Sequence, residues 1–208
     1  MDLSGVHSML IGMHSGMLTL AAGCVLITVV ARLNLKKQET NENRALWPTN
    51  SFIGKLARYA EPTAYLAGIG GIIGLVLSAI VGFYIWPIDF ITSSPIGLSK
   101  VMFSVFAMEL WIVFVFARSR YGENLWKKPG AAALYACLGI FGFLFVVVAG
   151  SFGGHMAGTG SIIDPLYAVL GIVPETFGVT GSGFMILVVS FSFVFTAVPM
   201  AVFNRFQK

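Results

Sequence analysis

Three histidines are the residues of this sequence with the clearest potential for metal or haem chemistry. His7 and His14 open the chain in "GVHSMLIGMHSG", and His155 stands in "GSFGGHM" at the end of a long apolar stretch. Neutral imidazole is an axial ligand of haem iron, and two imidazoles from different helices clamp a b-type haem. Copper is the alternative, because it also binds imidazole and thioether sulfur. Three methionines stand near the histidines as weaker candidate ligands: Met13, Met17 and Met156.

A second candidate is Glu109, which lies inside the apolar segment "VMFSVFAMELWIVFVFA". A carboxyl group within a membrane is costly, so we expect it to face the bundle interior, either protonated or paired. Counting about 1.5 Å per helical residue from the flanking basic residues puts Cys24, Cys137 and Thr196 at the same depth. Such a polar layer would suit proton transfer or a quinone head group. The alternative is a purely structural hydrogen bond between helices.

These side chains must be positioned by apolar helices. Hydrophobic residues make up 57% of the chain and charged residues only 11%, far below the charged share of soluble domains. Five segments are close to or above the ~20 residues that cross a bilayer as a helix. The sequence therefore predicts an all-α membrane protein with one transmembrane domain over residues 1–208. Its five expected spans cover residues 6–31, 62–86, 97–117, 130–152 and 183–203.

Basic residues orient these spans. Lys and Arg gather in residues 32–61, in residues 118–129 and in the tail, whereas the other two connections are poor in them. Basic loops stay in the cytoplasm, so we expect an outer N-terminus, a cytoplasmic C-terminus and a long outer loop over residues 153–182. The same rule explains the net charge of +4 without a nucleic-acid partner. The plasma membrane of a prokaryote is the expected location.

This topology places all three histidines in the outer half of the bundle. Counted from Arg32, His14 stands about 27 Å and His7 about 37 Å up the helix. Counted from Lys128, His155 stands about 40 Å up if its helix continues that far. By depth His7 is then the better partner of His155. If "GSFGG" breaks the helix instead, His155 folds back towards His14, and the sequence leaves both pairs open.

Other patterns describe packing. Gly70, Gly74, Ser78 and Gly82 recur every four residues, a spacing that lets helix backbones approach closely in lipid. A second glycine face in the first span lies opposite His7 and His14; it consists of Gly5, Gly12, Gly16 and Gly23. In the outer loop, "SIIDPLYAVLGI" predicts a short helix with Asp164 as its N-cap and Pro165 in its first turn.

Over about residues 10–158 the chain resembles a family of small four-helix bacterial and archaeal membrane proteins of unknown function, for which haem or redox roles are suspected. "MHSGMLTLAAG" and "GSFGGHM" occupy the positions of that family's first-helix histidine and its "GGH" motif. The resemblance implies that His14 pairs with His155. Two departures are an additional fifth span and Lys100, which stands where the family usually has a further histidine.

The sequence thus predicts a small redox or electron-transfer subunit in the membrane. We expect it to hold a b-type haem, or alternatively copper, on the outer side through His155 with His14 or His7, within a respiratory or oxidase-type complex. Glu109 would serve proton or quinone chemistry. The alternative function is a non-catalytic accessory subunit of a larger membrane complex, which the small-residue faces and the absence of a complete catalytic set favour. Both functions require the bilayer and other membrane subunits as partners.

Overall fold

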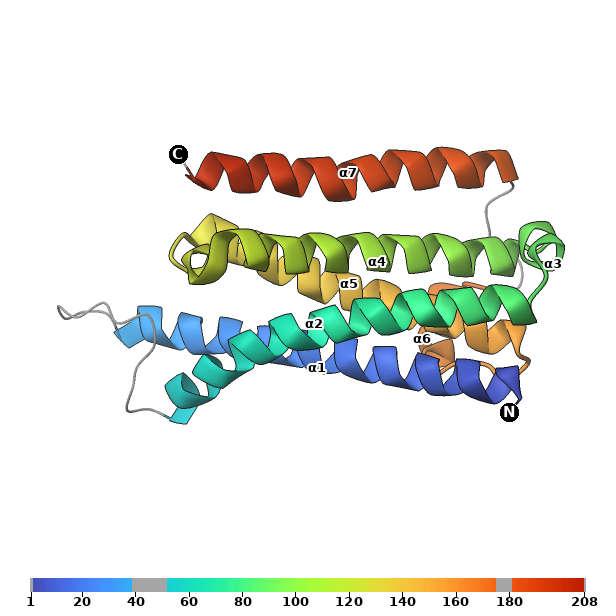
Figure 1. Cartoon of the computed structure of the whole chain (residues 1–208), viewed down its shortest axis with the longest axis horizontal. Coiled ribbons are helices and arrows are strands. Elements are labelled where there is room, and N and C mark those ends of the chain that lie inside the picture. Colours follow the sequence, from blue (N-terminus) through green and yellow to red (C-terminus); the bar gives the residue numbers. More distant parts are fainter. Residues whose placement is uncertain (1, 39–51, 175–180, 208) are drawn as a thin grey trace.

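Five long helices run side by side and form the body of the molecule (Figure 1). The computed structural model describes residues 2–38, 52–174 and 181–207, and these residues form helices and no strand. All five long helices are long and apolar enough to cross a membrane, which confirms the predicted fold class. They are α1 (Leu3–Gln38), α2 (Phe52–Ile85), α4 (Pro95–Tyr121), α5 (Pro129–Met156) and α7 (Gly181–Gln207).

The helices extend beyond the predicted spans. The expected loop over residues 32–61 is helical at both edges, because α1 continues to Gln38 and α2 already begins at Phe52. The expected loop over residues 153–182 begins later, since α5 continues through "GSFGG" to Met156. Hydropathy marks only the apolar part of a helix and misses turns that project beyond it. Residues 39–51 and 175–180 of the two predicted loops lie outside the described residues.

Three short helical segments lie in the connections: α3 (Ile88–Ser93), the 3-10 helix η1 (Gly122–Trp126) and α6 (Asp164–Leu170). The helix predicted in "SIIDPLYAVLGI" is confirmed as α6, but Asp164 as its N-cap is wrong. Ile163 occupies the cap and Asp164 is the first helical residue, because its carboxylate accepts hydrogen bonds from two groups outside the helix. Gly171 ends α6 with φ +65°, the left-handed conformation that glycine readily adopts.

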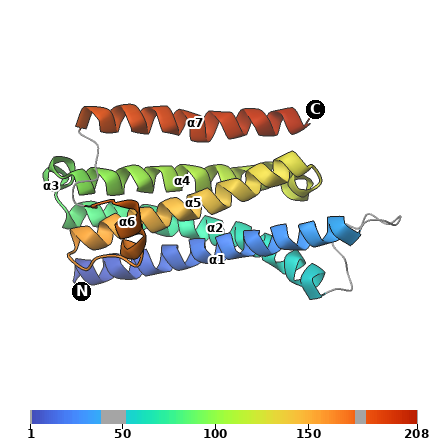
Figure 2. The same cartoon turned by 180° about the vertical axis from the view of Figure 1, so that it is seen from behind.

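The long helices pack mainly as two pairs, α1 with α2 and α4 with α5 (Figures 1 and 2). Helix α7 lies along α4 at the edge of the molecule. Only 11% of the most apolar 18-residue stretch of α7 is buried. The end that holds the N-terminus, α3 and α6 is called the His end here. The opposite end, with the C-terminus and η1, is called the basic end. Large aromatic side chains fill the core between them, with Trp111, Phe114 and Tyr135 fully buried.

Candidate functional site

His14 is buried where α1 meets α2. His14 is only 9% exposed, and its Nδ1 lies 2.9 Å from the carbonyl oxygen of Leu10, one turn earlier in the helix. Gly74 of α2 makes room for it, since a Cβ at that position would stand 2.9 Å from the Cβ of His14. A hydrogen bond from Nδ1–H to a carbonyl fixes the ring and selects Nε2 as the nitrogen with a free lone pair.

His7 lies two turns nearer the His end on the same helix. Its ring rests against Gly82 of α2, where a Cβ would stand 3.0 Å from the His7 Cε1. Its Nδ1 is buried without a hydrogen-bond partner among the described residues. Lys100 of α4 is near enough for its positive charge to act on the imidazole.

His155 is hydrogen-bonded to α6. Its Nε2 lies 2.8 Å from Oδ1 of Asp164, whose Oδ2 accepts the Ser161 backbone N–H at 2.9 Å. Two hydrogen bonds lower the pKa of the Asp164 carboxyl below its ordinary value. The bond from the Ser161 backbone N–H has the larger effect, and the bond with His155 comes second. The connection between α5 and α6 is thus held back against the end of α5 by one carboxylate.

The glycines before His155 make room for neighbours within a continuous helix. A Cβ at Gly153 would meet the Lys100 side chain, 3.3 Å from Cε and 3.5 Å from Nζ. A Cβ at Gly154 would stand 2.2 Å from the carbonyl oxygen of Gly160, where the chain packs back on α5. "GSFGG" therefore does not break α5, and of the two arrangements that the sequence left open the structure has the continuous helix.

The candidate ligands are distributed over the His end and do not form one cluster. Within residues 2–38, 52–174 and 181–207, no group of three or more His, Cys, Asp or Glu side chains is placed to hold a metal ion. Met13 and Met17 contribute to packing, because their side chains rest against Gly74 and Gly70 of α2. Met156 is partly buried in the last turn of α5.

Glu109 faces α7. Ser192 of α7 lies within hydrogen-bonding reach of its carboxyl group, while Oε2 is buried without a partner in the described part of the chain. The predicted polar layer around Glu109 is only partly present. Cys137 is exposed and so does not join it, and the Thr196 hydroxyl donates to the Ser192 carbonyl within α7. Cys24 is buried in the core.

The sequence-based search missed a buried ion pair nearer the basic end. Glu61 is 4% exposed, and its carboxylate accepts both Nε–H and Nη2–H of Arg118, the latter at 2.9 Å. The indole N–H of Trp126 donates to the same carboxylate at 3.3 Å. Hydropathy placed Glu61 in a loop, one residue before the second span. The available sequence signal was that Glu61 is a single acidic residue at the edge of an apolar segment, next to basic residues.

Comparisons of this chain with protein-family models, with curated proteins and with solved structures find no match. The resemblance to the four-helix family therefore stays a prediction.

Proposed function

We propose that this protein is an integral-membrane redox subunit that holds a b-type haem at the His end, with His14 as a ligand. The observation that carries the proposal is the state of the His14 ring. It is buried between two apolar helices, and Nδ1 is engaged by the Leu10 carbonyl oxygen at 2.9 Å. This second contact is the kind that orients metal-binding imidazoles and leaves Nε2 for iron.

The same geometry favours haem over copper. The porphyrin supplies four nitrogen ligands to iron, so the protein needs to provide only one or two imidazoles. A copper ion without a macrocycle takes most or all of its ligands from the protein. The described residues hold no cluster of three His, Cys, Asp or Glu side chains for that purpose, and Met13 and Met17 pack against α2.

His155 of α5 is the proposed second ligand. Its Nε2 contacts Asp164, a carboxylate that would orient the ring and raise its basicity. His7 and His14 are seven residues apart on one helix, about 10 Å along its axis, which is too far to share one iron. His7 and His14 are therefore alternatives in a pair with His155. The continuous helix α5 favours His7 by depth, whereas the burial of His14 and its Nδ1 contact favour His14.

A haem held there would supply one-electron transfer. Glu109, on the face of α4 that meets α7, is the proposed group for proton or quinone chemistry, supported by its buried Oε2 without a described partner. The distribution of Lys and Arg supports an outer His end and a cytoplasmic basic end. We place the protein in the plasma membrane of a prokaryote, within a respiratory or oxidase-type complex.

The test is a reduced-minus-oxidised visible spectrum of the full-length protein purified from its native membrane. The proposal expects a Soret band and an α-band, with about one iron per haem site by elemental analysis. A preparation that shows neither band and contains neither iron nor copper would overturn it.

A second candidate function is a cofactor-free accessory subunit, which one observation on α1 favours. A Cβ built at any glycine of the predicted second face would meet no atom within 4 Å: Gly5, Gly12, Gly16 and Gly23. Small residues at helical spacing let another transmembrane helix approach closely. If alanine at all three histidines leaves the assembly and activity of the host complex unchanged, this function replaces the redox subunit.

A further inference from the structure

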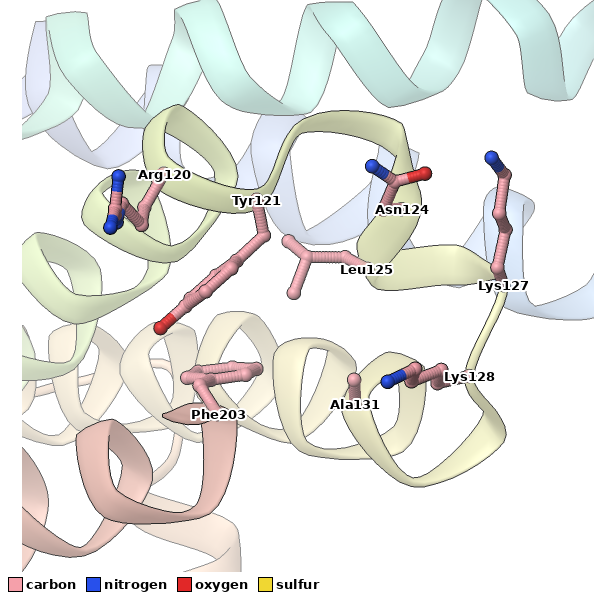
Figure 3. A pocket seen from close by; sticks show the side chains of 8 residues that line it. All are labelled: Arg120, Tyr121, Asn124, Leu125, Lys127, Lys128, Ala131 and Phe203. Atoms are coloured by element: carbon pink, nitrogen blue, oxygen red, sulfur yellow. The ribbon is translucent and has the colours of Figure 1, made fainter. Parts of the chain in front are cut away.

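A cavity of about 460 Å³ opens at the basic end, where α4, η1, α5 and α7 meet (Figure 3). Its floor is apolar, because Leu125, Ala131 and Phe203 are almost fully buried. Its size falls within the range of small-ligand sites. The cavity is independent of the histidines, which lie at the opposite end of the bundle.

Positive charge surrounds this floor. Arg120, Lys127 and Lys128 line the cavity, and no acidic residue of the described chain lines it. Figure 3 shows Arg120 on the α4 side and Lys128 on the α5 side, while the Lys127 side chain extends away from the space between them. Glu123 stands in η1 but is not among the residues that line the cavity. The charged side chains of the lining are therefore all basic, which suits an anionic ligand.

The position of the cavity points to a lipid anion. It lies at the ends of three membrane-length helices, α4, α5 and α7, where we expect phospholipid head groups to meet the hydrocarbon. Helix α7 runs from the cavity towards the His end, and only 11% of its most apolar 18-residue stretch is buried. A basic pocket between transmembrane helices, with apolar surface leading away from it, is the arrangement that holds an anionic lipid.

We propose that this cavity binds the phosphate-bearing head group of an anionic phospholipid, whose acyl chains lie along α7. The binding would brace a weakly attached helix. Tyr121 of α4 donates a hydrogen bond to Asn204 of α7 at 3.0 Å, and its ring lies 5.6 Å from that of Phe203. These contacts form one wall of the cavity, so a bound head group would hold α7 against α4 and α5.

The experiment compares full-length protein in phosphatidylcholine nanodiscs with and without phosphatidylglycerol. The readouts are the number of phosphatidylglycerol molecules retained after delipidation, by native mass spectrometry, and the thermal unfolding midpoint. The test variant is Arg120→Gln with Lys128→Gln. The matched control is Lys55→Gln with Arg58→Gln, which removes the same charges from exposed positions on α2 outside the cavity.

We expect the cavity variant to bind phosphatidylglycerol about thirtyfold more weakly, from about 1 kcal/mol for each lost cation, and to lose the stabilisation by this lipid. The control pair should keep both. Equal losses in the two variants would overturn the proposal, because they would show a general surface attraction. Equal stabilisation by inorganic phosphate in phosphatidylcholine nanodiscs would overturn the choice of a lipid, since a soluble anion would then suffice.

Discussion

Glu61 of α2 and Arg118 of α4, which are 57 residues apart in the sequence, form a bidentate ion pair. The Arg118 guanidinium also lies 5.9 Å from the centre of the Tyr65 ring, and Arg32 of α1 lies 5.5 Å from the centre of the Trp126 ring. Side chains from α1, α2, α4 and η1 therefore meet around one carboxylate. The pair fixes how the helices join near the basic end.

Breaking this pair should destabilise the protein strongly. Arg118→Gln leaves Glu61 buried without its cation, and removing one partner of a buried pair costs about 3–5 kcal/mol. The free energy of unfolding, measured by SDS titration in mixed micelles, should fall by roughly that amount. Arg58→Gln on the exposed side of α2 is the control and should change it little. In the double variant Glu61→Gln with Arg118→Gln the loss should be smaller than the sum of the single losses.

Gly74 of α2 should tolerate a side chain poorly, because it packs directly against α1. The Cβ of Gly74→Val would stand 2.9 Å from Cβ and 3.4 Å from Cα of His14, atoms that cannot move without shifting α1. Overpacking of this kind costs about 1–3 kcal/mol. Gly16→Val on the open face of α1 is the matched control, because its Cβ meets no atom within 4 Å. Equal unfolding free energies for the two variants would contradict the close α1–α2 contact.

Much of the fold could be predicted from the sequence because it depends on local composition. A run of apolar residues predicts each membrane helix, and "SIIDPLYAVLGI" predicts α6. The glycine repeat of α2 likewise predicted a close approach, and the structure places Gly74 against His14. Such features need no knowledge of which helices are neighbours.

The pairs between elements could not be predicted this way. Asp164 has the residue type and position of an N-cap, yet its carboxylate bonds to Ser161 and His155, because the chain after α5 turns back on that helix. A helical count placed Cys137 at the depth of Glu109 but gave no information on the direction of its side chain, which is exposed. The depth of a residue in the membrane follows from the sequence of its own helix, whereas the direction of its side chain depends on how several helices pack together.

The link between Asp164 and His155 should fail in acid. The pKa of Asp164 is lowered, so its carboxylate stabilises the folded loop at pH values above the ordinary carboxyl value of about 3.9. This contribution is lost as the pH falls through the lowered pKa. In nanodiscs, pepsin should cleave residues 157–163 of the wild type only below about pH 3.9, whereas Asp164→Asn should be cleaved there already at pH 5. Asp89→Asn, in α3 at the same end, should behave as the wild type.

Glu109 should be protonated at neutral pH, because its Oε2 is buried and no cation is found beside it in the described chain. Infrared difference spectra should therefore contain the carbonyl stretch of a neutral carboxylic acid. Glu109→Gln should remove this band while changing the unfolding free energy by less than about 1 kcal/mol, since the amide has a similar shape and no charge. A band that persists in the variant would assign the neutral acid to another residue.

His14 should control haem content if the redox proposal holds. His14→Ala should lower the haem bound per protein by at least about tenfold, because no other imidazole of α1 occupies that depth. In His14→Gly, added imidazole should restore the Soret band, since it can enter the space left by the side chain and supply the missing nitrogen. Asp164→Asn should lower haem affinity by about tenfold while keeping the ligand itself, because the Asp164 carboxylate orients His155. Full haem content in His14→Ala together with loss in His7→Ala would assign the ligand to His7, and full content in both would remove α1 from the site.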